Sequence, residues 1–217
     1  MEATDVADQL GELAEELPER AARRRTEVSG ERFRRGAALA IAVLAMLLAI
    51  NSVGGANAGG QEVNNNIQAS DTWAFYQAKN IRQTSLRVAA DELELLLPLL
   101  PPEQRAEAAK RIDGYKEAAA RYESEPDPAD PANPLKGEGK KELSAQARGF
   151  EAKRERAQSQ GPNFDLAGAL FQIGIVLGSV AVLAMSRPIL GLGLASGAVA
   201  TALMANGFFL WFELPIA

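Results

Sequence analysis

Three blocks of apolar residues constrain this chain more than any other feature of its sequence. They cover residues 36–50, 166–185 and 189–212, and a long charged segment separates the first from the other two. A helix needs about 20 mostly apolar residues to cross the hydrocarbon core of a membrane. The second and third blocks have that length, and the first reaches it by continuing through residues 51–58. The blocks therefore predict an all-α membrane protein with one N-terminal and two C-terminal transmembrane helices.

The predicted organisation follows the blocks in chain order. A polar arm precedes the first helix, and a charged helical insert outside the membrane, with a proline-rich loop at 126–134, separates it from the other two. The predicted segments are the cytoplasmic arm (1–35), the first transmembrane helix (36–58), the insert (59–163) and the second and third transmembrane helices (164–186 and 188–213).

The composition excludes several classes of function. The chain has no histidine and no cysteine, which are the usual ligands of zinc, haem and iron–sulfur clusters and essential parts of Ser-His-Asp and Cys-His catalytic groups. No phosphate-binding glycine loop is present. The net charge of −5 disfavours nucleic acid as a partner. We therefore expect no catalytic residue, no cofactor and no metal site.

The N-terminal arm changes sign along its length. Residues 2–19 carry only negative charge, whereas residues 20–35 contain seven arginines. Apolar residues at helical spacing predict a short amphipathic helix over 5–17 that ends before Pro18. Such a helix either packs loosely on its own protein or docks a cytoplasmic partner. The arginines directly precede the first apolar block and place the N-terminus in the cytoplasm by the positive-inside rule.

A secretory signal peptide is the competing interpretation of the first block, because Ala-Asn-Ala at 56–58 resembles a cleavage site. The region before the block is about twice as long as usual for a signal peptide, and half of it is acidic. We expect a retained membrane anchor. Arg187, between the second and third helices, also fits the cytoplasmic side. The insert is then predicted to lie outside.

The insert shows helical patterns and no strand-like alternation. Helices are predicted over 61–97, 103–123 and 140–160, and prolines end the first. Apolar side chains recur every seven residues in the first, which is the spacing of a coiled-coil seam. These residues are Ile67, Ala74, Ile81, Val88 and Leu95. The companion positions are mostly polar, so this helix needs neighbours, and a helical bundle or coiled coil is expected.

Residues 68–82, Gln-Ala-Ser-Asp-Thr-Trp-Ala-Phe-Tyr-Gln-Ala-Lys-Asn-Ile-Arg, resemble the signature of a bacterial membrane family catalogued as domain of unknown function 4337. Family members share a polar arm, one span, a charged helical insert and two closely spaced C-terminal spans. The resemblance implies a location in the bacterial cytoplasmic membrane and supplies no activity. The motif residues are Ser70, Asp71, Trp73, Tyr76, Gln77 and Lys79.

Trp73 and Tyr76 lie at helical spacing shortly after the first span. We expect them to pack against the returning helix around 150–164, because aromatic pairs at this spacing usually serve packing. Asp71 and Lys79 are then solvated or interhelical charges. A ligand or ion site is the alternative.

All three spans carry glycines four residues apart, a spacing that allows close approach of helices in lipid. The pairs are Gly55 and Gly59, Gly174 and Gly178, and Gly193 and Gly197. Together with the incomplete seam of the insert, they predict a homo-oligomer. Asn51, Asn57 and Asn64 are candidates to line a pore, although asparagines often serve only as hydrogen-bonding contacts between helices.

The sequence thus predicts a non-enzymatic, homo-oligomeric scaffold or accessory subunit in the lipid bilayer. A homo-oligomeric channel with an asparagine-lined axis is the alternative.

Overall fold

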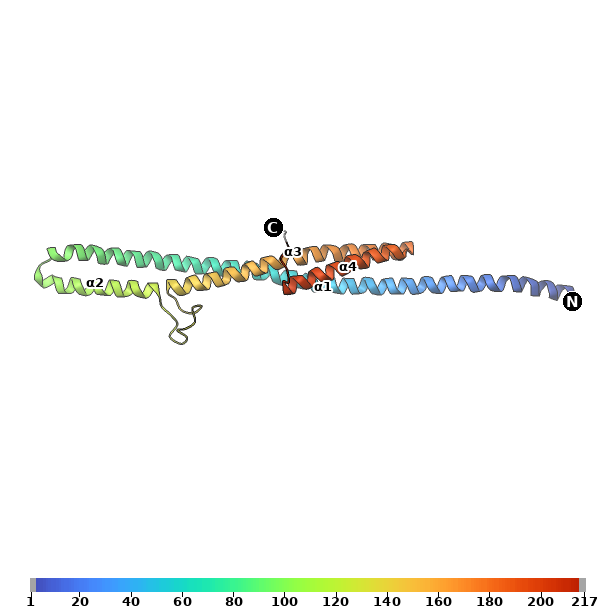
Figure 1. The fold of residues 1–217 in the computed structure, drawn as a ribbon, viewed down its shortest axis with the longest axis horizontal. Coiled ribbons are helices and arrows are strands. Elements are labelled where there is room, and N and C mark those ends of the chain that lie inside the picture. The colour runs from blue at the N-terminus through green and yellow to red at the C-terminus, as the bar shows by residue number, and fades with distance from the viewer. Residues whose placement is uncertain (1–2, 215–217) are drawn as a thin grey trace. The chain divides into compact units, whose positions relative to one another are not determined.

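The computed structural model describes the backbone of residues 3–214 and the side chains of residues 27–214. These residues form four α-helices, one short 3-10 helix and no strand, which confirms the predicted all-α fold. The elements are α1 (Ala3–Leu96), η1 (Leu97–Leu99), α2 (Pro102–Glu123), α3 (Lys140–Ala184) and α4 (Arg187–Phe209) (Figure 1).

Prolines mark most of the helix ends. α1 ends at Leu96, two residues before Pro98, and α2 begins at Pro102, where the missing N–H of proline costs no helical hydrogen bond. The helix predicted over 103–123 coincides with α2. The proline-rich stretch 126–134 lies in the non-helical segment between α2 and α3.

Two prolines do not interrupt their helices. α1 continues through Pro18, so the prediction that a helix ends there is wrong. A proline removes one hydrogen bond and crowds the preceding turn, but strong helix formers surround Pro18 and the helix persists. α3 likewise continues through Pro162, where the preceding Gly161 has no Cβ to clash with the proline ring. The side chains of the acidic arm lie outside the described residues.

The connection between α3 and α4 is a single tight turn. Met185 takes a positive φ of 50°, and the Ser186 backbone N–H donates to the carbonyl of Ala181 at 3.1 Å. Pro188 then falls in the first turn of α4. The turn places α3 and α4 side by side in antiparallel orientation.

The chain divides into two compact units. The first comprises Met1–Ala56 and Gln160–Ala217, and the second comprises Asn57–Ser159. In the described part of the chain, three helices are long and apolar enough to cross a membrane, namely α1, α3 and α4. The most apolar parts of α3 and α4 belong to the first unit.

The second unit is built around an antiparallel pair. α1 and α2 meet through η1, and α3 follows α2 end to end and runs beside α1 (Figure 1). Its buried apolar side chains are mostly alanines, with Ala69, Ala90 and Ala119 each under 5 % exposed and Ile112 and Leu143 the largest. Polar side chains fill the remaining inner positions of α1.

Candidate functional site

The apolar helices of the first unit expose large side chains and bury mostly small ones, together with Phe164 and Phe171. Large side chains such as Leu39, Leu183 and Val176 are 68 %, 85 % and 60 % exposed. The buried positions of α4 are instead mostly small, among them Gly193, Gly197 and Ala200. In water such an exterior would be unstable, because a monomer rarely exposes large contiguous apolar patches. The distribution suits an apolar solvent.

The predicted glycines of α3 and α4 form a close helix contact. A methyl group placed on Gly174 would lie 2.8 Å from the backbone oxygen of Gly193, and one placed on Gly193 would lie 2.9 Å from the oxygen of Gly174. Gly178 faces Ile41 and Gly197 faces Leu44, both on α1. These four glycines therefore allow three helices to meet with little space between their backbones.

The two glycines of the predicted pair on α1 have different environments. Gly55 lies against Phe164, whose Cβ would be 3.3 Å from a methyl group at that position. Gly59 faces nothing within 4 Å in the described part of the chain. Gly54, which the sequence pattern did not single out, packs against the ring of Phe164 and also faces Phe208. The glycine spacing identified the contact face but missed the residue at its centre.

The candidate pore asparagines take different environments. Asn51 is 3 % exposed, and its Nδ2 donates to the backbone oxygen of Phe164 at 2.8 Å. Asn57 and Asn64 are exposed and belong to the second unit. Asn206, buried in the first unit, donates to Asn163 Oδ1 at 2.7 Å. The buried asparagines thus link helices inside the protomer.

The family-like motif lies on both faces of α1 in the second unit. Trp73 Nε1 donates to Glu151 Oε1 on α3 at 2.8 Å, and its ring meets that of Tyr76 edge-on with centroids 5.4 Å apart. Lys79 pairs with Glu125 at 3.2 Å and lies 5.8 Å from the centre of the Tyr122 ring. These three motif residues bind α1 to the rest of its unit.

Gln83 continues the same inner face and is 1 % exposed. It donates to the Ala119 backbone oxygen at 2.9 Å and to Glu123 at 2.8 Å, and it accepts from Lys140 Nζ at 2.9 Å. Lys140 also lies 5.5 Å from the centre of the Tyr76 ring. Sequence reasoning missed Gln83 because a polar residue gives no apolar signal. Its spacing of seven from Tyr76 and four from Lys79 could have identified it.

Two carboxyl groups of this unit have lowered pKa values. The hydrogen bond from Gln83 lowers the pKa of Glu123, burial opposes that shift, and Lys140 adds to it. Burial raises the pKa of Glu142, but hydrogen bonds, among them those from the Ser124 hydroxyl and the Glu125 backbone N–H, outweigh it and leave that pKa lowered. Both groups are therefore held in the charged form by specific donors.

The other motif residues, Ser70, Asp71 and Gln77, are exposed. They lie beside the predicted seven-residue seam, which points away from the interior of the unit. Ile67, Ile81, Val88 and Leu95 are 51 %, 66 %, 48 % and 78 % exposed, and Ala74 is also exposed. We call these five residues the outer stripe. The interior of the unit uses a second repeat on the opposite face, which includes Ala69, Thr72, Gln83 and Ala90.

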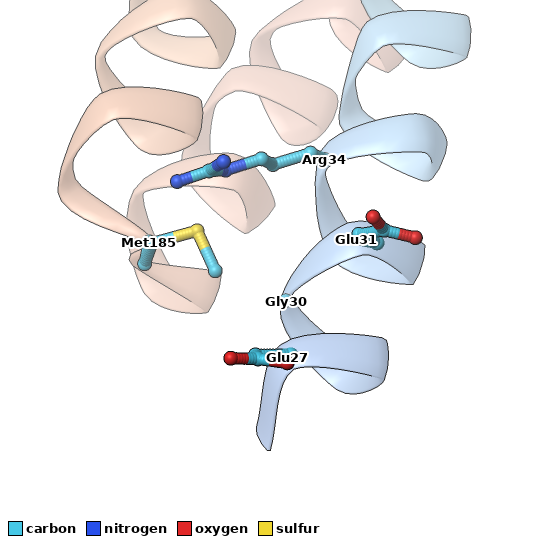
Figure 2. Close-up of a pocket in the computed structure, with 5 residues that line it drawn as sticks. All are labelled: Glu27, Gly30, Glu31, Arg34 and Met185. Carbon is cyan, nitrogen blue, oxygen red and sulfur yellow. The ribbon is translucent and has the colours of Figure 1, made fainter. Parts of the chain in front are cut away.

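A pocket of about 460 Å³ lies where α1 passes the turn between α3 and α4. Figure 2 shows its lining residues Glu27, Gly30, Glu31, Arg34 and Met185, with the Arg34 and Met185 side chains reaching toward each other. Two carboxylates and one guanidinium share this space. Because the pocket presents both negative and positive groups, its charges do not indicate a particular class of ligand.

The comparisons with known proteins give one match. A family model described as a domain of unknown function (DUF4337) matches residues 33–210, which include most of α1, all of α3 and α4, and the motif. No curated protein and no solved structure matches the chain at a significant level.

Proposed function

The chain belongs to the DUF4337 family, whose description names no activity, and from that premise we propose a non-enzymatic, self-associating scaffold or accessory subunit of the bacterial cytoplasmic membrane. Its insert would present a helical surface to envelope partners outside the cell. Its acidic arm would be available to a partner inside.

The first unit supports insertion into a membrane. Small residues allow its helices to meet closely around Phe164 and Phe171, and large apolar side chains cover its exterior, the arrangement expected when lipid is the solvent. α1, α3 and α4 each have the length and hydropathy to cross the hydrocarbon core. The arginines before the first apolar block, together with Arg187, favour the cytoplasmic side for the N-terminus and for the turn between α3 and α4.

The outer stripe is the observation that carries self-association. Its side chains repeat every seven residues over 67–95, and the described part of the unit leaves them exposed. Full burial of one such side chain is worth about 1.5–3 kcal/mol, so two copies meeting along the stripe would gain several kcal/mol. A seven-residue repeat also fits another α-helix better than a flat partner. We assign the stripe to a second copy of this chain.

One pair of charged residues beside the stripe favours a second copy of this chain. Copies inserted in one membrane share an orientation, so their α1 helices would run parallel. In a parallel, in-register pair, the residue directly before a stripe position on one helix lies close to a residue of the partner helix. That partner residue is four positions after the same stripe position. At Val88 these residues are Arg87 and Glu92, both exposed and of opposite charge.

The oligomeric state tests this proposal. The full chain in detergent should be an oligomer by native mass spectrometry, and replacing both Ile81 and Val88 with lysine should leave monomers. Phe75→Lys is the matched control, because Phe75 is exposed on the same helix and lies off the stripe. A strictly monomeric unmodified chain, or equal dissociation in the control, would contradict the proposal.

The channel alternative requires asparagines around a shared axis. Asn51 is engaged inside the protomer, and Asn57 and Asn64 would flank the stripe contact. Conductance of the reconstituted protein measures this alternative directly. A current that Asn51→Leu abolishes would replace the scaffold with a channel.

A further inference from the structure

Large aromatic side chains gather where α4 ends. Phe208, Phe209, Trp211 and Phe212 are all exposed, and Trp211, at 68 %, is the most exposed of the four. The rings of Phe209 and Trp211 stack, with their centroids 5.3 Å apart and their planes 11° from parallel. We call residues 208–212 the aromatic turn. An exposed apolar cluster of this kind marks a contact surface.

Asn206 fixes the shape of the aromatic turn. Its side chain is fully buried, its Nδ2 donates to the Phe212 backbone oxygen at 2.9 Å, and its Oδ1 accepts from the Phe212 backbone N–H at 3.1 Å. The same Nδ2 donates to Asn163, which ties the turn to α3. The backbone N–H of Leu210, a residue with a positive φ of 50°, donates to the Asn206 carbonyl at 2.7 Å. The turn therefore has a defined shape.

The same hydrogen bonds prepare the turn for contact with lipid. Backbone outside a helix is costly near hydrocarbon unless its polar groups are paired within the protein. The N–H of Leu210 and both backbone polar groups of Phe212 find their partners on Asn206. A turn that faced only water would not need this pairing, because water would satisfy the same groups.

The position of the turn fits one boundary of a bilayer. α4 has 23 residues, which cover about 34 Å at the rise of an α-helix, so it can cross a hydrocarbon core of about 30 Å and end at its edge. Phe208 faces Gly54 of α1, and the part of α1 from Arg35 to Gly54 covers about 28 Å. Both helices therefore extend from an arginine, Arg35 or Arg187, to the level of the aromatic turn.

Polar groups place the turn at the edge of the hydrocarbon and not within it. The indole of Trp211 is apolar but carries an N–H donor, and such a ring is favoured where hydrocarbon meets water. Glu213 is exposed two residues later, and its carboxylate requires water. On α3 the exposed Asp165 follows Phe164, whose ring meets that of Phe208 edge-on with centroids 5.0 Å apart. Water is therefore needed at the level of the turn.

We propose that the aromatic turn is an interfacial anchor, which binds the boundary between the headgroups and the hydrocarbon of the bilayer and fixes the depth of α4. The partner is the lipid surface, because the turn continues the exposed apolar side chains of α4, among them Leu192 and Val199, to the point where charged residues begin. This inference rests on the proposed membrane insertion. In the proposed orientation the turn lies in the outer leaflet.

The depth of Trp211 in lipid tests the anchor. The chain has two tryptophans, so Trp73→Phe leaves Trp211 as the single emitter in the full protein. This protein is reconstituted in phosphatidylcholine vesicles whose acyl chains carry bromine either near the headgroup or near the chain end. Bromine near the headgroup should quench Trp211 more strongly. In the matched control, Trp211→Phe, the remaining Trp73 lies in the second unit and should be quenched by neither lipid.

Two further variants test the fixed shape of the turn. In the Trp73→Phe background, Asn206→Leu removes the hydrogen bonds to Phe212, and Phe209→Ala removes the exposed ring stacked on Trp211 without changing the buried interior. Each should make quenching by the two lipids more nearly equal, because the indole then samples a range of depths. Phe75→Ala, which removes an exposed ring of the second unit, should leave the difference unchanged. Circular dichroism verifies that each variant folds.

The other outcomes are distinct. Stronger quenching by bromine near the chain end, or none by either lipid, overturns the anchor, and it leaves membrane insertion standing if the protein resists extraction from the vesicles by alkaline carbonate. Absence of quenching would assign the turn to a protein partner. An unchanged difference in both folded variants overturns the role of the fixed turn. A protein that carbonate removes from the vesicles contradicts the proposed membrane insertion itself.

Discussion

Gly174 and Gly193 approach each other so closely that neither position has room for a methyl group. Gly193→Ala should push α3 and α4 apart and lower stability by about 1–3 kcal/mol, several degrees in melting temperature. Gly191→Ala is the control, since a methyl group there meets nothing within 4 Å. Thermal melts of both variants in detergent measure the difference. Equal melting temperatures would contradict the packing described.

Gln83 is the residue on which the polar interior of the second unit depends. Gln83→Leu keeps the volume but removes the hydrogen bonds to Lys140, Glu123 and the Ala119 carbonyl, and Lys140 then retains only its longer contact with Glu123 and the Tyr76 ring. The expected loss is roughly 2 kcal/mol or more. Gln77→Leu changes the same residue type at an exposed position and should be nearly neutral. Urea unfolding followed by circular dichroism compares them, and similar midpoints would argue against the central role of Gln83.

Acid should weaken the same unit. The pKa values of Glu123 and Glu142 are lowered in the folded state, so their contribution is present above the unfolded value of about 4.5 and is lost as pH falls through the lower folded values. Melting temperatures should therefore drop below about pH 4.5. Glu142→Gln should make that drop shallower. A drop of the same size in Glu142→Gln would show that the acid sensitivity arises from other groups.

At the scale of elements, the outer stripe predicts a defined register. The chain has no cysteine, so a single introduced cysteine reports one contact. Ile67→Cys and Leu95→Cys should each form a disulfide with the same residue of a second copy, because parallel helices bring equal stripe positions together. Phe75→Cys should cross-link poorly. Cross-links only when the Ile67→Cys and Leu95→Cys chains are mixed would instead indicate antiparallel helices.

The sequence identified this repeat, but not that it lies on the outside of the unit. Apolar periodicity identifies Ile67, Ile81 and Val88 as a seam, and the natural expectation is that the insert buries it. The interior is formed by the opposite face, where alanine, threonine and glutamine side chains are short or fully hydrogen-bonded. Hydropathy cannot identify such a face, because its burial depends on hydrogen-bond partners that are distant in sequence.

The apolar helices are the easier part of the prediction. Length and hydropathy indicate α1, α3 and α4, and glycine spacing indicates the contact between Gly174 and Gly193. The continuity of α1 through Pro18 and of α3 through Pro162 does not follow from the sequence pattern, since proline lowers helix stability without always ending a helix.

At the scale of the whole molecule, orientation is the property to measure. Two single cysteine variants report the orientation. Ala132→Cys places the thiol between α2 and α3, and Ser29→Cys places it in the basic arm. With the N-terminus inside, a membrane-impermeant maleimide should label Ala132→Cys in intact cells and Ser29→Cys only after lysis. Labelling in the opposite order would invert the topology and place the outer stripe in the cytoplasm.

The polar interior of the second unit also has a consequence for biogenesis. A segment of about a hundred residues that folded around leucine and isoleucine would offer the insertion machinery further candidate spans. Here the inner face of α1 carries Asn65, Thr72 and Gln83, and such residues keep the emerging chain out of the bilayer. With the proposed orientation, the same side chains that make the folded interior specific would let the insert cross the membrane as a single uninterrupted loop.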